Sequence, residues 1–235
     1  MYAPAFNALR GSTSELFVLI GTSHYWSDRP LILTEKHFST PLGLVETDRP
    51  LVDRLRMEPG TDLPHKPEHS LELHIVILQH VLQGRPFQIL PILVGGIDAE
   101  DAAAREHLAQ AGRRVREAVD ASGKSATWLI SGDLAHVGLK FGDETPADAM
   151  LLDVNAHDRE LVALLEGADI EGYHQVIARD QEAFRVCGHA PTIVALEALR
   201  PAWGKLLAYD VWDDRDTQSA VSFATMAFGG NQQTP

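Results

Sequence analysis

The chain contains five side chains whose types and positions would suit metal binding or proton transfer: His24, His69, Asp133, His136 and Cys187. His24 ends the segment Gly21-Thr-Ser-His, which follows a short continuous apolar run. In an open α/β sheet, ligands bind beyond the carboxyl ends of the strands, so His24 is placed for a metal ligand or an acid/base group. A histidine in a surface loop is the alternative explanation of this position.

Asp133 and His136 follow another apolar run, in the segment Ser131-Gly-Asp-Leu-Ala-His. One turn after a strand could therefore bring both side chains to the same rim of a sheet. A carboxylate beside an imidazole can bind a metal, or it can orient the imidazole for proton transfer. Alternatively, Asp133 caps the next segment and His136 lies in water.

His69 opens a predicted buried helix after a proline-rich loop, which makes it a candidate ligand. Alternatively, His69 or Ser70 caps this helix, and Glu72 closes a capping box. Cys187 lies just before another apolar helix, where the helix dipole would favour its thiolate form. A small buried hydrophobic role is the alternative for this cysteine. His189 is an additional candidate, either inside the site or on its rim.

Continuous apolar runs predict strands that are buried on both faces, as in a parallel sheet. Pro91 lies inside the second run and argues for a bend or an edge position. A polar linker at residues 213–217 predicts a hairpin loop between the last two strands. The predicted strands cover residues 15–21, 87–96, 126–133, 206–212 and 220–228.

Helical patterns lie between these strands. The predicted helices cover residues 70–83, 100–122, 145–165, 169–185 and 190–199. The alternation predicts an α/β fold with a mostly parallel central sheet flanked by helices. We expect one domain over residues 1–235. Residues 48–67, which include four prolines, are expected to form a long irregular loop.

Composition narrows the function further. The formal net charge of -13 and the lack of a basic stripe argue against nucleic-acid binding. One cysteine rules out a disulfide within the chain. No apolar stretch approaches the roughly 20 residues that cross a bilayer, and residues 1–10 do not resemble a signal peptide, so we expect a cytoplasmic protein that does not bind membranes. The sequence has neither a P-loop motif nor a G-x-S-x-G elbow.

Several short motifs, in this order and spread over nearly the whole chain, resemble the Memo family, also called AmmeMemoRadiSam system protein B. The motifs are Gly21-Thr-Ser-His24, Thr40-Pro-Leu-Gly43, His69-Ser-Leu-Glu72, Pro91-Ile-Leu-Val-Gly95, Ser131-Gly-Asp-Leu-Ala-His136, Cys187-Gly188 and Ser219-Ala-Val-Ser-Phe-Ala224. Family members usually begin with an extra strand that carries a Pro-His-Ala-Gly-Tyr-like motif. This chain starts inside that region, at Tyr2-Ala-Pro-Ala-Phe6, so we expect that strand to be missing or truncated.

The resemblance implies a fold similar to that of class III extradiol dioxygenases, which use non-haem Fe(II). It also implies that His24 and His69 match the family's two site histidines, and that Asp133 and His136 match its strand-end pair. Cys187 lies where the dioxygenases have a carboxylate ligand. A copper-dependent redox activity has been proposed for the family.

These observations support a metal-dependent redox enzyme as the first hypothesis. His24, His69 and Cys187 would bind the metal, and His136, oriented by Asp133, would act as acid/base. Two histidines and a cysteine suit copper or zinc, whereas Fe(II) prefers two histidines and a carboxylate. The second hypothesis is a non-catalytic binding module, with no metal bound, that uses the pocket for a small anion or a peptide. A metal-dependent hydrolase ranks last. The substrate and the oligomeric state are not predicted.

Overall fold

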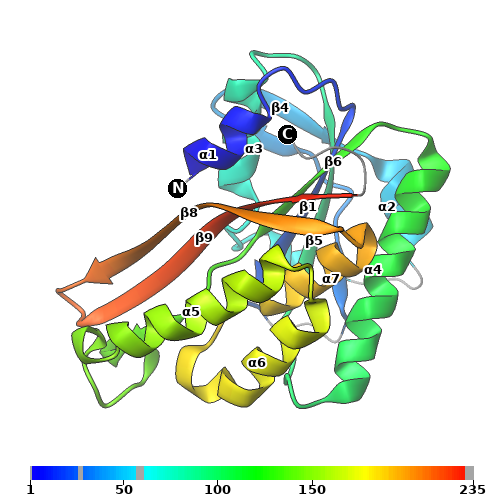
Figure 1. Ribbon diagram of the computed structural model, residues 1–235. Coiled ribbons are helices and arrows are strands. Elements are labelled where there is room, and N and C mark those ends of the chain that lie inside the picture. The colour runs from blue at the N-terminus through cyan, green and yellow to red at the C-terminus, as the bar shows by residue number, and fades with distance from the viewer. Residues whose placement is uncertain (1, 26–28, 57–60, 231–235) are drawn as a thin grey trace.

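The computed structural model describes residues 2–25, 29–56 and 61–230 (Figure 1). The α-helices are α1 (Tyr2–Ala8), α2 (Arg49–Leu55), α3 (Glu72–Val81), α4 (Ala102–Ser122), α5 (Leu151–Glu166), α6 (Ile170–Phe184) and α7 (His189–Leu199). Short 3-10 helices cover Leu63–His65, Leu139–Phe141 and Ala147–Ala149. The strands are β1 (Leu16–Ser23), β2 (Leu31–Leu33), β3 (Phe38–Thr40), β4 (Gly43–Thr47), β5 (Gln88–Gly95), β6 (Ala126–Ser131), β7 (His136–Gly138), β8 (Trp203–Asp214) and β9 (Ser219–Gly229).

The central sheet has six strands, in the order β3-β4-β5-β1-β6, with β2 also paired to β5. The strands β4, β5, β1 and β6 run parallel, and β2 and β3 are antiparallel additions. This arrangement confirms the predicted α/β fold with a mostly parallel central sheet. The strand at residues 16–23 is buried along its whole length, as its continuous apolar run predicts.

Pro91 does not lie at a sheet edge, so the edge position, one of the two explanations that the sequence offered, is wrong. It pairs with Leu19 in β1, in the middle of the parallel sheet. On the other side of β5, pairing with β4 ends at Ile89 and pairing with β2 begins at Ile92. The proline, which has no N–H to donate, falls in the gap between these two partners and leaves both ladders intact.

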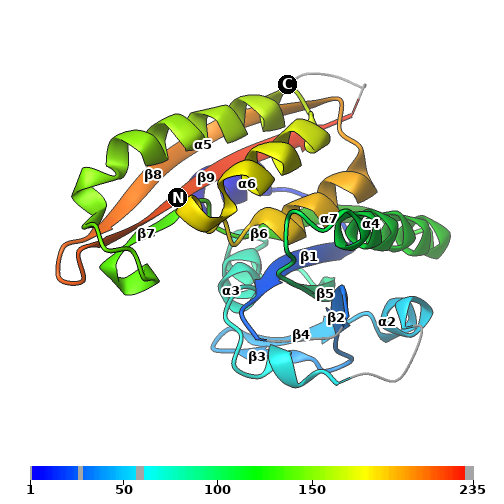
Figure 2. The same ribbon diagram turned by 90° about the horizontal axis from the view of Figure 1, so that it is seen from below.

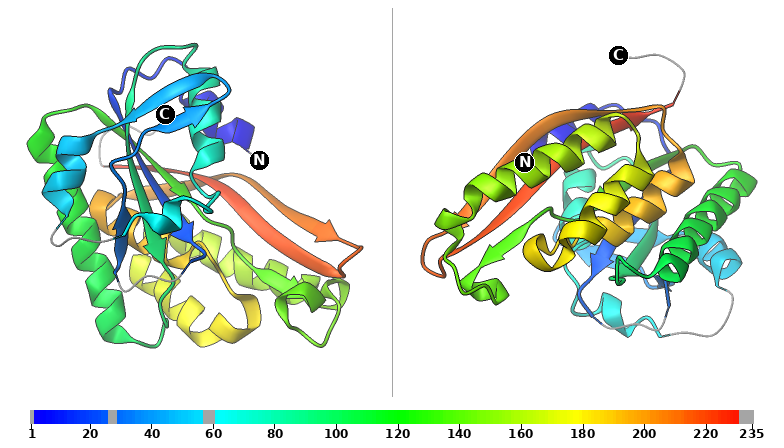
Figure 3. Two further views of the ribbon diagram at one scale, coloured as in Figure 1. Left: turned by 180° about the vertical axis from the view of Figure 1, so that it is seen from behind. Right: turned by 60° about the horizontal axis from the view of Figure 1, so that its bottom comes forward.

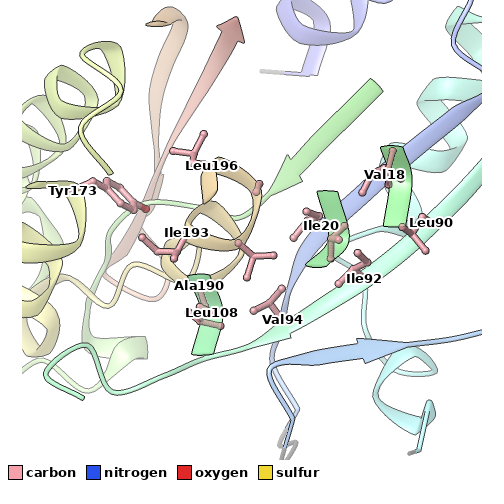
Figure 4. Packing of buried hydrophobic residues seen from close by; sticks show 14 of the residues in the cluster. Val18, Ile20, Leu90, Ile92, Val94, Leu108, Tyr173, Ala190, Ile193 and Leu196 are labelled. Carbon is pink, nitrogen blue, oxygen red and sulfur yellow. The ribbon is translucent and has the colours of Figure 1, made fainter. Parts of the chain in front are cut away.

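Two hydrophobic cores lie on opposite faces of the sheet. Alternate residues of β1 serve each face: Val18 and Ile20 pack against α4 and α7, whereas Phe17 and Leu19 pack toward α3. Figure 2 shows α4, α6 and α7 on one side of the sheet and α3 on the other. In the larger core the side chains of strands and helices interdigitate (Figure 4). The sheet is thus covered on both faces.

A second, antiparallel sheet has the order β7-β9-β8. The β8–β9 hairpin confirms the predicted strands and loop near the C-terminus, and it projects beyond the central sheet (Figure 3). Ser222 of β9 ties this hairpin to the segment after β6. It accepts the backbone N–H of Leu134 on its carbonyl and that of Ala135 on its Oγ, both over 2.9 Å.

Residues 48–67 are not an irregular loop throughout. Asp48 accepts the backbone N–H of Leu51 and caps α2, and Pro50 occupies the first turn, where its missing N–H costs nothing. Residues 57–60 lie outside the described residues. Near the N-terminus, Tyr2–Ala8 forms a helix and no strand. Among the described helices, none combines the length and apolarity needed to cross a membrane.

Candidate metal site

Four segments meet at the carboxyl ends of β1 and β6. His24 follows β1, His69 precedes α3, the segment 133–136 follows β6, and Cys187 precedes α7. Hydrogen bonds from side chains to backbone hold these segments together. Ser70 Oγ donates to the carbonyl of Thr22 over 2.8 Å, and Thr22 Oγ1 donates to the carbonyl of Cys187 over 2.7 Å. The end of β1 is therefore fixed to two of the other segments.

The first group of possible metal ligands consists of His24, Glu68 and His69. One ligand atom of each lies within 4.8 Å of the others. The two imidazoles stack with 5.3 Å between ring centroids and 13° between their planes. The Glu68 side chain is 2% exposed, whereas those of His24 and His69 are 44% and 75% exposed. The group is therefore a buried carboxylate beneath two solvent-facing imidazoles.

Glu68 is a site residue that the sequence reasoning missed. Burial by itself raises the pKa of Glu68. Hydrogen bonds from the backbone N–H groups of His24, His69 and Ser70, and from the His24 ring, outweigh burial and hold the pKa below its usual value. Glu68 is therefore ionised at neutral pH. The sequence signal for Glu68 is its place directly before His69, in Pro67-Glu-His.

The proposed capping box is wrong. The residue at the helix N-cap is Leu71, which makes no side-chain capping bond, and Glu72 is exposed. The hydroxyl of Ser70 is committed to Thr22. Glu68, which precedes the helix, accepts the backbone N–H groups of His69 and Ser70.

The second group consists of Asp133, His136 and Cys187, again with ligand atoms within 4.8 Å of one another. The backbone N–H of Asp133 donates to Cys187 Sγ over 3.2 Å. Nε2 of His136 lies 3.9 Å from Oδ2 of Asp133. Nδ1 of His136 lies 3.2 Å from the carbonyl of Leu134, which can only accept, so Nδ1 carries the proton. Nε2 is then the basic nitrogen, and it faces Asp133.

Burial dominates the electrostatics of this second group. It raises the pKa of Asp133, an effect that the neighbouring His136, His24 and His69 partly offset. It lowers the pKa of His136, with opposing contributions led by Asp133. It also raises the pKa of Cys187 to about 11, and the charge of Asp133 adds to this rise. The expectation of a thiolate favoured by the helix dipole is therefore wrong for the metal-free protein, because the partial burial of Cys187 and the nearby charge of Asp133 raise the pKa of the thiol.

The two groups are neighbours. The charges of His24 and His69 act on Asp133, and that of Glu68 acts on Cys187. Burial and the charge of Asp133 also raise the pKa of Tyr2, so α1 lies within electrostatic reach of the site. The structure groups Cys187 with Asp133 and His136, whereas the sequence reasoning grouped it with the two histidines. The assignment of ligand and acid/base roles stays a prediction.

His189 lies apart from both groups. Its Nε2 is 3.0 Å from Nδ1 of His174, and burial lowers its pKa to about 3. A cavity of about 410 Å³ lies beside Cys187, and His189 and Thr22 line it with apolar side chains such as Ile177. A larger groove of about 990 Å³ lies at the amino ends of β1 and β5 and contains none of the predicted site residues. The smaller cavity is thus the one next to the candidate chemistry.

A glycine pair permits the contact between the Asp133 and Cys187 segments. A Cβ on Gly132 would lie 2.3 Å from the Cα of Gly188, and a Cβ on Gly188 would lie 2.8 Å from the carbonyl oxygen of Asp133. The N–H of Gly188 donates to that same carbonyl over 2.9 Å. Two side-chain-free residues are therefore required for these backbones to approach.

Comparison with known proteins identifies the family. The model for Memo-like proteins matches residues 1–227. A MEMO1 family protein of Aquifex aeolicus is 28% identical over 236 residues, which cover 97% of this chain and 59% of that protein. A MEMO1 family protein of Pyrococcus abyssi is 33% identical over 225 residues, which cover 90% of this chain and 75% of that protein. Because the family model spans nearly the whole chain, the chain belongs to the Memo-like protein family.

Proposed function

We propose that this protein binds one transition-metal ion between the two polar groups and uses it for redox chemistry on a small molecule. The observation that carries the proposal is the gathering of two sets of possible ligands, from four separate segments, at one edge of the sheet. A parallel α/β sheet places its ligand sites at this edge.

The side chains present fit such an ion. In the proposed site, His24 and His69 supply imidazole nitrogens, Cys187 supplies sulfur, and Asp133 offers a carboxylate oxygen. Nitrogen and sulfur donors favour copper or zinc, and the addition of a carboxylate extends the choice to Fe(II). Copper and iron are the candidates for redox chemistry, because zinc does not change its oxidation state.

A bound copper or iron ion would supply electron transfer at the site. His136 would handle protons there, since its Nδ1 proton is held by the Leu134 carbonyl and its lowered pKa leaves Nε2 free to accept one. Asp133 would stabilise the resulting imidazolium. The exposed imidazoles of His24 and His69 leave the ion open to a substrate from solvent. A cytoplasmic location is part of this proposal.

Metal analysis tests the proposal directly. We expect protein purified without added metal to carry, or to take up on titration with Cu(II) or anaerobic Fe(II), one ion per chain. We expect His24→Ala to bind less than one ion per chain, or to bind the ion at least tenfold more weakly than the wild type. Failure of both ions to bind the wild-type protein would overturn the proposal. His107→Ala, at an exposed position on α4, is the matched control.

The cavity beside Cys187 favours one alternative, a non-catalytic module that holds a small anion or a peptide without a metal. In that case phosphate or short acidic peptides would raise the melting temperature of metal-free protein, and Cu(II) or Fe(II) would not. Stabilisation by metal alone would favour the metal-dependent function.

A further inference from the structure

Glu68 contacts both histidines of the site from beneath. We propose that Glu68 is a positioning residue that keeps the protons of His24 and His69 on Nδ1, so that both Nε2 atoms present lone pairs to the metal. This inference rests on the proposed metal-binding function. It assigns Glu68 a role other than that of a ligand, although its carboxylate lies close enough to the imidazoles to be one.

The contact with His24 fixes one proton. Nδ1 of His24 lies 3.2 Å from both carboxylate oxygens of Glu68. Both oxygens of Glu68 accept backbone N–H groups and therefore act as acceptors here, so Nδ1 must donate. A neutral imidazole carries one proton, and Nε2 is then bare. Within the described part of the chain, Nε2 of His24 forms no hydrogen bond that would compete with a metal.

The Nδ1 edge of His69 faces the same carboxylate at ion-pair distance, where the negative charge favours a proton on that nitrogen over a lone pair. Its Nδ1 lies 3.2 Å from Oε1 of Glu68. Because the two rings are nearly parallel, their Nδ1 edges face one buried anion. One carboxylate therefore orients two imidazoles, an arrangement that commonly raises the basicity of metal-binding histidines.

The oxygens of Glu68 are already occupied. Oε1 accepts the backbone N–H groups of His69 at 2.8 Å and Ser70 at 3.1 Å, and Oε2 accepts that of His24 at 2.7 Å. A carboxylate has about four lone-pair positions, and the His24 ring takes a further one. A metal ion on Glu68 would have to displace a backbone donor in a site where the side chain is 2% exposed. The Nε2 atoms of the exposed His24 and His69 side chains can bind a metal without the loss of a hydrogen bond to Glu68.

The proton positions can be measured without any metal. Imidazoles in water prefer to carry the proton on Nε2, so the proposed state is the uncommon one. We suggest labelling the histidines with ¹⁵N and recording their ring nitrogen shifts in metal-free protein above neutral pH. His24→Gln and His69→Gln assign the two signals. Glu68→Gln is the test variant, and Glu72→Gln, at an exposed position four residues away, is the matched control.

We expect the Nδ1–H form for His24 and His69 in the wild type and in Glu72→Gln, and a shift toward the Nε2–H form in Glu68→Gln. Cu(II) affinity should fall by about 10- to 100-fold in Glu68→Gln, with the same number of nitrogen ligands in the electron paramagnetic resonance spectrum. Wild-type rings in the Nε2–H form would overturn the inference even if Glu68→Gln does not fold. Failure of wild-type protein to bind metal would instead overturn the proposed function and leave the tautomer result standing.

Discussion

The backbone N–H of Asp133 points at the sulfur of Cys187, 3.2 Å away, although 54 residues separate them in the chain. The thiol is therefore held by the segment that carries the neighbouring carboxylate. An N–H donor at this distance stabilises negative charge on sulfur, and this opposes the effect of burial on the thiol. The same N–H would stabilise the thiolate if a metal ion displaced the thiol proton.

Replacing Cys187 by Ser should remove the sulfur ligand and preserve the packing. Co(II) is a suitable probe, because a cobalt ion bound to thiolate absorbs strongly in the near ultraviolet. We expect this band in wild-type protein and its complete loss in Cys187→Ser, with circular dichroism unchanged. A band of equal strength in the variant would show that Cys187 is not a ligand.

Gly132→Ala should disturb both the fold and the site. Its Cβ would lie 2.3 Å from the Cα of Gly188, so one backbone must move. We expect a loss of about 1–3 kcal/mol in the free energy of unfolding, measured with urea. We also expect weaker Co(II) binding, because the Asp133 and Cys187 segments separate. Gly96→Ala is the control, since its Cβ would meet nothing within 4 Å, and its stability should stay within about 0.5 kcal/mol of the wild type.

His74 should make stability depend on pH. His74 is a residue of α3 that packs against α1, and its burial lowers its pKa from 6.5 to about 4. Between these values the unfolded chain binds a proton that the folded protein does not, so stability falls as the pH falls from 6.5 to about 4. This group accounts for about 3 kcal/mol over that range.

Comparison with His74→Phe isolates this contribution. Phenylalanine keeps an aromatic ring against Tyr2 and Phe6, whose centroids lie 5.4 and 5.7 Å from the imidazole. As the pH falls from 6.5 to about 4, the wild type should lose about 3 kcal/mol of unfolding free energy relative to His74→Phe. A parallel pH dependence in both proteins would contradict the prediction, and His107→Gln serves as the exposed control.

Lys124→Met should destabilise the protein without affecting metal binding. Lys124 Nζ lies 2.6 Å from Oδ2 of the buried Asp48 and 2.7 Å from Oε1 of Gln88. Its loss leaves a buried carboxylate without a cation, for which we expect about 2 kcal/mol. Co(II) affinity should be unchanged, because Lys124 precedes β6 and the site lies beyond the other end of that strand. Asp48→Asn should cost about 1 kcal/mol less than Asp48→Ala, since asparagine keeps the helix cap.

The elements with strong hydrophobic patterns were predictable. The runs that became β1, β5 and β6 are continuous because helices cover both faces of the sheet, and the long helix α4 is amphipathic and capped by Asp101. The short strands β2, β3 and β4 have only three to five residues each, too few for a period to emerge. Helix α2 was hidden because it begins a proline-rich segment, but its own proline, Pro50, occupies the first turn.

The site was predictable in its members but not in their grouping. Strand ends and helix starts converge at one edge, so the five residues could be chosen from position and resemblance. The distances between them depend on how loops from distant parts of the chain pack, as the contact of Gly132 with Gly188 shows. Glu68 escaped because its importance comes from its burial and its three backbone donors, which residue type alone does not indicate.

The hydrogen bonds of Ser222 have a practical consequence for anyone who shortens this chain. Residues 134 and 135 run along β9 on one side, while the adjoining carbonyl of Asp133 is held by Gly188 on the other. A chain cut before β8 would keep the central sheet and lose one of the two supports of this segment. His136 itself belongs to β7, which pairs only with β9 within the described residues. The projecting hairpin, which looks like a dispensable appendage, is therefore part of the minimal unit that any truncation should retain.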